Sequence, residues 1–220
     1  MESPFERLSL MIAPAVVEKE VEVSAKDFVF RYTYTLDPHD QDEPIKKFPY
    51  KKYCEGLIDI WLRESLILIV KSRQMMVSWL FVSLCLWLAR FHKGQYIFFV
   101  SKKEDDAGFS TPLSLLSRAF FIYTHLPTEF RTAYKKSGTP SMLNFIDENS
   151  IIHGVSQDSD ALRQYTASCI LSDEMAFQER SEQVFAAAKP TIDGGGKFTG
   201  ISTPNGKRNL FYNLVHDIRE

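Results

Sequence analysis

The chain has 220 residues, of which 45% are hydrophobic and 25% are charged, and its formal net charge is −2. This composition is typical of a globular protein with one well-buried core, and it excludes a strongly basic protein that binds nucleic acid through an overall positive field. Nucleic-acid contacts would need a local patch. The lysine pairs at 46–47, 51–52, 102–103 and 135–136 are candidates, although each is also explained as solvated surface.

Cysteine usage and hydropathy argue against a disulfide framework, a zinc site, a membrane span and a secretory signal. Cys54, Cys85 and Cys169 are far apart and form no C-x-x-C pair, so neither a disulfide framework nor a zinc site is expected. The uncharged run at 75–89 is shorter than the roughly 20 residues of a membrane span, and we expect a core helix there. The first 15 residues lack a basic start before an apolar stretch and do not resemble a secretory signal.

Residues 1–45 are expected to form a lid or appended segment, with a strand at 28–36 and a polar loop at 37–44. Residues 46–220 are expected to form the main domain. Its predicted elements are a helix within 50–64, a strand at 66–70, a helix at 77–91, a strand at 96–101, a mostly helical stretch at 103–126 broken near Thr111, two short strands within 143–155, a strand at 168–172, a helix at 179–189, a strand at 197–202 and a helix at 209–219.

Short apolar strands that alternate with helices indicate an α/β fold, with a mostly parallel sheet sandwiched between helices. Ligands of such sheets bind at the carboxyl ends of the strands. Three of the predicted strands end in polar clusters, and these are the candidate site.

The first cluster is KSRQMMVS, residues 71–78. An ordinary phosphate-binding loop reads G-x-x-x-x-G-K-[ST], because its glycines let backbone N–H groups approach the phosphates. With Ser78 at the hydroxyl position, Lys71 and Met76 replace the glycines and Val77 replaces the lysine. Two interpretations stay open: a polar bend between core elements, or a phosphate loop in which Lys71 or Arg73 folds back over the phosphates. In the second, backbone N–H groups would still lie at a helix N-terminus.

The second cluster ends the strand in SCILSDEMA, residues 168–176, with Asp173 and Glu174. An apolar strand that ends in Asp-Glu is typical of a Walker B motif, in which the aspartate contacts Mg²⁺ and the glutamate polarises the attacking water. A surface acidic pair is the alternative. The interval between Ser78 and Asp173 leaves room for the intervening elements of a sheet.

The third cluster is GISTPNG, residues 200–206. Ser202 and Thr203 are small donors that could sense a terminal phosphate or an attacking water. The alternative is a polar junction with a tight turn at Asn205–Gly206.

Together the three motifs resemble the ATPase domain of the large terminase subunit of tailed bacteriophages, the viral motor that packages double-stranded DNA into capsids. KSRQMMVSW resembles a divergent Walker A, ILSDEMAF a Walker B and ISTPNG a coupling motif, within about residues 45–215. The resemblance implies a P-loop NTPase fold of the ASCE type and ATP hydrolysis coupled to DNA translocation. Terminases commonly have a basic residue at the front of the loop and an RQ pair inside it, so the missing glycines are compatible with a nucleotide site.

The resemblance also implies roles for individual residues. The ATP-binding residues would be Lys71, Ser72, Arg73, Gln74, Met75, Met76, Val77, Ser78, Ser202 and Thr203, with Lys71 and Arg73 on the phosphates. Ser78 and Asp173 would hold Mg²⁺, and Glu174 would be the catalytic carboxylate. Arg163 matches an arginine that precedes Walker B and would act in trans as an arginine finger, or else it is a surface arginine. The upstream adenine-reading glutamine is missing, and Phe48, Tyr50 or Tyr53 would stack on the base instead.

The partners implied are double-stranded DNA, a portal protein, a small terminase subunit and further copies of the chain in a ring on the capsid, in the host cell cytoplasm and without a membrane. DNA would be held mainly through its phosphates. Large terminases usually carry a carboxyl-terminal RNase H-like nuclease, which would begin where this chain stops, so we expect no DNA cleavage by this chain. Two alternatives stay open: a helicase-like DNA-dependent ATPase, and a non-catalytic binding module with a degenerate nucleotide fold.

Overall fold

The computed structural model describes residues 22–158 and 160–216. The helical segments are α1 (Ala25–Asp27), the π-helix η1 (Phe28–Tyr32), α2 (Lys52–Arg63), α3 (Val77–Phe91), α4 (Glu104–Ala107), α5 (Leu115–His125), the 3-10 turns η2 (Thr128–Phe130) and η3 (Met175–Phe177), α6 (Ala161–Gln164), α7 (Ser181–Asp193) and α8 (Leu210–Val215). The strands are β1 (Tyr34–Leu36), β2 (Ile45–Lys47), β3 (Leu66–Val70), β4 (Tyr96–Ser101), β5 (Tyr134–Gly138), β6 (Ser141–Phe145), β7 (Ser150–Ser156), β8 (Cys169–Asp173) and β9 (Lys197–Ser202).

Seven strands form one sheet in the order β3-β9-β8-β4-β7-β6-β5. The first five are parallel, and β6 and β5 extend the sheet in antiparallel fashion, so the predicted mostly parallel sheet is confirmed. Strand β9 lies between β3 and β8, and Val70 pairs with Ser202 while Asp173 pairs with Ile201. The carboxyl ends that bear the three polar clusters therefore meet at one edge of the sheet.

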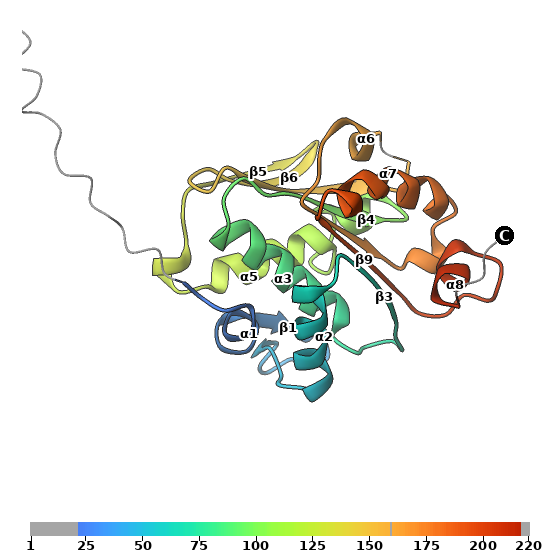
Figure 1. Cartoon of the computed structure of the whole chain (residues 1–220). Helices are drawn as coiled ribbons and strands as arrows, with labels where there is room; N and C mark the ends of the chain where they lie inside the picture. The colour runs from blue at the N-terminus through green and yellow to red at the C-terminus, as the bar shows by residue number, and fades with distance from the viewer. Residues whose placement is uncertain (1–21, 159, 217–220) are drawn as a thin grey trace, which may run out of the picture.

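Helices cover both faces of the sheet, with α3 and α5 on one side and α6 and α7 on the other (Figure 1). Side chains alternate between the faces along each strand. In β4, Ile97 and Phe99 belong to the core cluster around α3, whereas Phe98 and Val100 belong to the cluster under α7. A strand buried on both faces reads as the unbroken apolar run seen in YIFFV.

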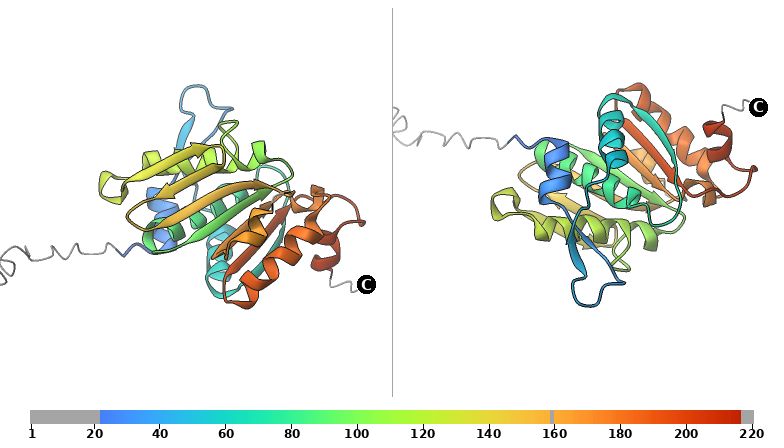
Figure 2. Two further views of the ribbon diagram at one scale, coloured as in Figure 1. Left: turned by 90° about the horizontal axis from the view of Figure 1, so that it is seen from above. Right: turned by 90° about the horizontal axis from the view of Figure 1, so that it is seen from below.

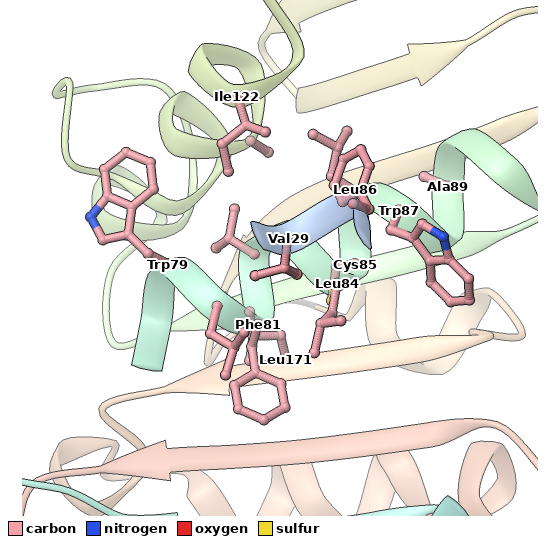
Figure 3. Close-up of a cluster of buried hydrophobic side chains, with 14 of the residues drawn as sticks. Val29, Trp79, Phe81, Leu84, Cys85, Leu86, Trp87, Ala89, Ile122 and Leu171 are labelled. Carbon is pink, nitrogen blue, oxygen red and sulfur yellow. The ribbon is translucent and has the colours of Figure 1, made fainter. Parts of the chain in front are cut away.

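Helix α3 is the centre of the larger core, and Figure 3 shows its side chains packed against α5, the η1 region and the sheet. Leu80, Phe81, Val82 and Leu84 are fully buried. The helix is apolar nearly all round because other elements surround it. Cys85 faces Cys169 across this core with 3.8 Å between the sulfur atoms, and both are free thiols, as is Cys54.

The predicted strand at 28–36 is wrong in its first half, because residues 28–32 form the π-helix η1 and only β1 is extended. Phe28 and Val29 are both fully buried. Consecutive residues of a strand point to opposite faces, so a strand with one face on the core would bury only one of them. Aromatic and β-branched residues favour strands locally, but packing of Phe28 on Phe91, with ring centroids 5.7 Å apart, decides the conformation here. Strands β1 and β2 form a hairpin that projects from the body (Figure 2). The first 21 residues of the expected lid lie outside the described residues.

The other differences are small. Helix α7 runs past Pro190, where we expected it to end; the proline lies in the last turn, and its carbonyl still accepts the Gly194 N–H at 3.0 Å. Strand β5, rich in exposed lysine, was not predicted, whereas β6, β7 and the break between α4 and α5 were. The predicted helix end beyond 216 lies outside the described residues. Across the described part of the chain, no helix is long and apolar enough to cross a membrane.

Candidate functional site

The glycine-free loop between β3 and α3 adopts the backbone that glycines usually provide. Gln74 and Met76 have φ angles of 60° and 57°, in the left-handed region that side chains disfavour. Met76 occupies the position of the second glycine of the ordinary phosphate loop. The loop is anchored at both ends, because Lys71 N–H donates to the Ser202 carbonyl at 3.0 Å and the Tyr53 hydroxyl donates to the Met75 carbonyl at 2.8 Å.

The side chains of the loop divide into two groups. Ser72, Arg73 and Gln74 are exposed, whereas the methionines at 75 and 76 pack partly against the main core and Val77 is buried. The apolar residues that replace the usual glycine and lysine therefore serve the core, and the polar residues at the front of the loop stay accessible.

The loop and the acidic strand end are in direct contact. The Ser78 hydroxyl, in the first turn of α3, donates to Asp173 Oδ1 at 3.0 Å. The Lys71 ammonium forms an ion pair with Glu174, with 3.1 Å between Nζ and Oε1. Glu174 is itself left-handed, with a φ of 51°, and this backbone turns its side chain away from the line of the strand. Four of the predicted residues are thus gathered at one place.

The Asp173 carboxylate is partly buried. Burial raises its pKa, while the positive charges of Arg118 and Lys71 and the Ser78 hydrogen bond act in the opposite direction. Gln178 donates to the backbone carbonyl of Asp173 at 2.9 Å, which fixes the strand end. A partly desolvated carboxylate is a strong ligand for a cation.

The end of β9 contributes two residues with different surroundings. The Ser202 side chain is fully buried, and its Oγ accepts the Ala176 N–H at 3.1 Å, so it links β9 to the segment after Glu174. The Thr203 hydroxyl donates to Glu174 Oε2 at 3.2 Å. Asn205 donates to the Ala176 carbonyl at 2.9 Å. One side chain, Thr203, therefore ties this segment to the acidic pair, and Ser202 and Asn205 tie it to the backbone of Ala176 just beyond that pair.

A cleft of about 480 Å³ opens beside these residues. Four of the predicted site residues line it: Arg73, Asp173, Glu174 and Thr203. Sequence reasoning missed six other polar lining residues, which are Ser101, Lys102, Asp106, Thr111, Ser114 and Arg118. Ser101 ends the interior strand β4 and Lys102 follows it, so the rule of strand ends would have found both. Arg118 lies inside a largely apolar helix, where only the helical spacing of four residues from Ser114 signals a shared face.

The remaining candidates lie elsewhere. Arg163 is an exposed residue of α6 and lines a separate hollow of about 100 Å³. Tyr50 is 63% exposed, and its hydroxyl donates to Glu55 at 2.7 Å. Phe48 is 3% exposed and packs edge-on against Phe30, so it has no free face for a base. Tyr53 is partly exposed and adjoins the loop through its hydroxyl.

The donor set at the acidic strand end fits Mg²⁺. The ion prefers oxygen ligands and is usually held by one or two protein groups together with water and phosphate oxygens. Ser78 and Asp173 offer such a pair. Within residues 22–158 and 160–216, no group of three or more His, Cys, Asp and Glu side chains could hold a metal ion.

Comparisons with known proteins gave structural matches but no match by sequence: no protein-family model matches the chain, and neither does any curated protein. The large terminase of bacteriophage HK97 matches with a TM-score of 0.67 at 13% identity, over 88% of this chain and 40% of that protein. A mutant ATPase domain of the Thermus phage P74-26 large terminase matches with a TM-score of 0.60 at 20% identity, over 76% of this chain and 70% of that one. The large terminase of the thermophilic bacteriophage D6E in complex with ADP matches with a TM-score of 0.53 at 16% identity, over 77% of this chain and 42% of that protein.

These likenesses show the fold. The chain shares the architecture of these large-terminase structures, a mostly parallel sheet flanked by helices. It spans less than half the length of the HK97 and D6E proteins.

Proposed function

We propose that this chain is the ATP-hydrolysing motor domain of a terminase large subunit, which drives double-stranded DNA into a capsid. One observation carries the proposal: the Ser78 hydroxyl of a loop at a helix N-terminus lies 3.0 Å from Asp173 at the end of a neighbouring strand. A hydroxyl and a carboxylate in this arrangement are the Mg²⁺ ligands of a P-loop NTPase. The fold shared with large-terminase ATPase domains, one of them in complex with ADP, supports it.

The residues of the site act as follows. Lys71, with Arg73 beside it, neutralises the phosphates, and the N–H groups at the start of α3 donate to them. Ser78 and Asp173 would hold Mg²⁺, which would offset the negative charge of the phosphates. Glu174 accepts a proton from the attacking water, and Thr203 holds its carboxylate in place. Thr203 is the first residue of the segment at 203–206. A movement of the Glu174 side chain therefore shifts that segment and the residues that pack against it.

The partners follow from the same proposal. Double-stranded DNA is held through its phosphates by lysines of the surface, and the chain assembles with copies of itself into a ring beside a portal protein and a small terminase subunit, in the host cytoplasm. The structural similarity to large terminases of phages supports this assignment. DNA binding of this kind weakens steeply as salt rises.

A phosphate-release assay with ATP, Mg²⁺ and linear double-stranded DNA tests the proposal. We expect turnover that DNA stimulates, that chelation of Mg²⁺ abolishes, and that in Ser78→Ala needs about tenfold more Mg²⁺ or higher. No phosphate release under any of these conditions, together with no nucleotide binding, would favour the non-catalytic module. Release that accompanies strand displacement but no capsid filling would favour the helicase-like ATPase.

A further inference from the structure

Arg118 is a partly buried cation that forms no ion pair with a carboxylate of the described residues. Its side chain extends from α5 toward the cleft, and its Nε atom is fully buried without a hydrogen-bond partner. The buried Arg90, by contrast, pairs with Glu148. A guanidinium has five N–H donors and stays protonated in proteins.

Such a group destabilises the folded chain unless something compensates it. Burying a charge without an ion-pair partner destabilises the folded state, and a buried N–H without an acceptor adds to this cost. The guanidinium carbon lies 5.3 Å from the centre of the Trp79 ring, and this cation–π contact compensates only part of the cost. Burial lowers the pKa of Arg118, and the charge of Asp173 offsets only part of this effect. The protein alone leaves the cation undercompensated.

The surroundings of Arg118 indicate what completes it. It lines the cleft of about 480 Å³ together with Asp173, Glu174 and Thr203, the groups assigned above to Mg²⁺ and to the attacking water. Lys102 and Arg73 line the same cleft and Asp106 adds a third carboxylate, so three cations and three carboxylates surround one space. A ligand that satisfies both kinds of charge is an anion that also carries a divalent cation.

We propose that Arg118 binds the terminal phosphate of ATP within its own subunit, and that it distinguishes the triphosphate from the diphosphate. This inference rests on the proposed ATPase function and adds a phosphate-binding residue that none of the three sequence motifs contains. The planar guanidinium matches two phosphate oxygens at once, and Trp79 holds its plane in place. ADP lacks the terminal phosphate and would leave the Arg118 charge uncompensated, so Arg118 would not contribute to the affinity for ADP.

The test uses the full chain with Glu174→Gln, so that ATP itself is the probe without turnover. We expect Arg118→Met in this background to weaken Mg²⁺–ATP binding by about 10- to 100-fold, the loss typical of a hydrogen bond to a charged group. ADP affinity should change by less than about twofold, and Arg118→Lys should fall between the two. Arg31→Met is the matched control, because Arg31 is an arginine with a side chain 71% exposed that does not line the cleft.

Thermal unfolding without nucleotide separates binding from a structural role. Since Arg118 is undercompensated, Arg118→Met should melt at the same temperature as the parent or higher. A lower melting temperature, or equal losses of ATP and ADP affinity, would overturn the inference.

A parent that binds neither nucleotide would remove the ATPase proposal instead. In that case, melting temperatures measured with and without inorganic phosphate at matched ionic strength test whether Arg118 binds an anion. If phosphate raises the melting temperature of the parent but not that of Arg118→Met, the anion site is supported. If phosphate changes both melting temperatures equally, the anion site is overturned.

Discussion

Lys71 and Glu174 lie 103 residues apart in the chain and form an ion pair in the structure, with 3.1 Å between Nζ and Oε1. The Lys71 side chain is only 10% exposed, and Thr203 holds the second oxygen of the same carboxylate. Both oxygens of Glu174, the proposed base, are therefore already paired. The phosphates of a bound nucleotide would compete with Glu174 for Lys71. Binding of ATP would free the carboxylate for water, which links the loop to the chemistry.

Lys71→Ala should remove this cation and weaken Mg²⁺–ATP binding by about tenfold or more, since charge-assisted hydrogen bonds to phosphate contribute roughly 1.5–3 kcal/mol each. Arg73 is exposed and lines the cleft without an ion pair among the described residues, so Arg73→Ala should have the smaller effect. Isothermal titration of both variants with a non-hydrolysable ATP analogue makes the comparison. If only Arg73→Ala loses affinity, the two basic roles are exchanged.

Glu174→Gln should lower phosphate release by about 10²- to 10⁴-fold, the usual contribution of a general base. Nucleotide affinity should be retained, because the amide still accepts from Thr203 and Lys71 is freed for the phosphates. Steady-state phosphate release and equilibrium binding, measured on one preparation, give the two readouts. Hydrolysis at the wild-type rate would exclude Glu174 as the base.

Much of this site could be predicted because it lies at the ends of parallel strands. The apolar runs that end at Val70, Asp173 and Ser202 mark strands buried on both faces, and parallel pairing brings their carboxyl ends to one edge. Spacing alone did not reveal which of the polar residues are accessible. Ser202 is buried and links backbone segments, while Thr203, one residue later, reaches Glu174.

The parts that sequence reasoning missed depend on packing between distant segments. Phe28 lies in a stretch with strand propensity, yet contact with Phe91 on α3 selects a helical turn. Arg118 is one charged residue among the apolar positions of α5, and only the position of that helix over the strand ends turns it toward the cleft. The only local signal for either effect is the four-residue spacing between Ser114 and Arg118.

Met76→Gly tests why the loop works without glycine. Met76 has a φ of 57°, and a side chain in this region costs about 1–2 kcal/mol, which glycine does not pay. Relief of this strain should offset the lost thioether packing, so Met76→Gly should unfold within about 1 kcal/mol of the parent and keep its nucleotide affinity. Met76→Val, which is β-branched, should be less stable than both in urea unfolding. Equal stability of the valine variant would show that position 76 is not held left-handed.

Asp173→Asn should raise the melting temperature of the nucleotide-free protein at pH 7. Burial raises the pKa of Asp173 in the folded state above its ordinary value of 3.8, so the ionised carboxylate lowers stability at every pH above the folded-state pKa. As the pH falls through that pKa, the folded protein takes up the proton first and the penalty disappears. The gap in melting temperature between variant and parent should therefore be widest near pH 7 and close toward pH 4. A gap independent of pH would mean that the carboxylate charge is not its cause.

Mixing two inactive variants tests whether Arg163 acts on a neighbouring subunit. Arg163 is exposed on α6 and lies outside the cleft that holds Glu174, so within one chain it has no described route to the terminal phosphate. If it serves the next subunit of a ring, Arg163→Ala should lose most DNA-stimulated turnover, up to about 10³- to 10⁵-fold, while binding of nucleotide to isolated chains stays unchanged. Wild-type specific activity should rise with protein concentration. A mixture of Arg163→Ala with Glu174→Gln should regain activity, because a site with an intact Glu174 can then receive an intact arginine from its neighbour. Turnover that is independent of concentration and unaffected by Arg163→Ala would identify Arg163 as an ordinary surface residue.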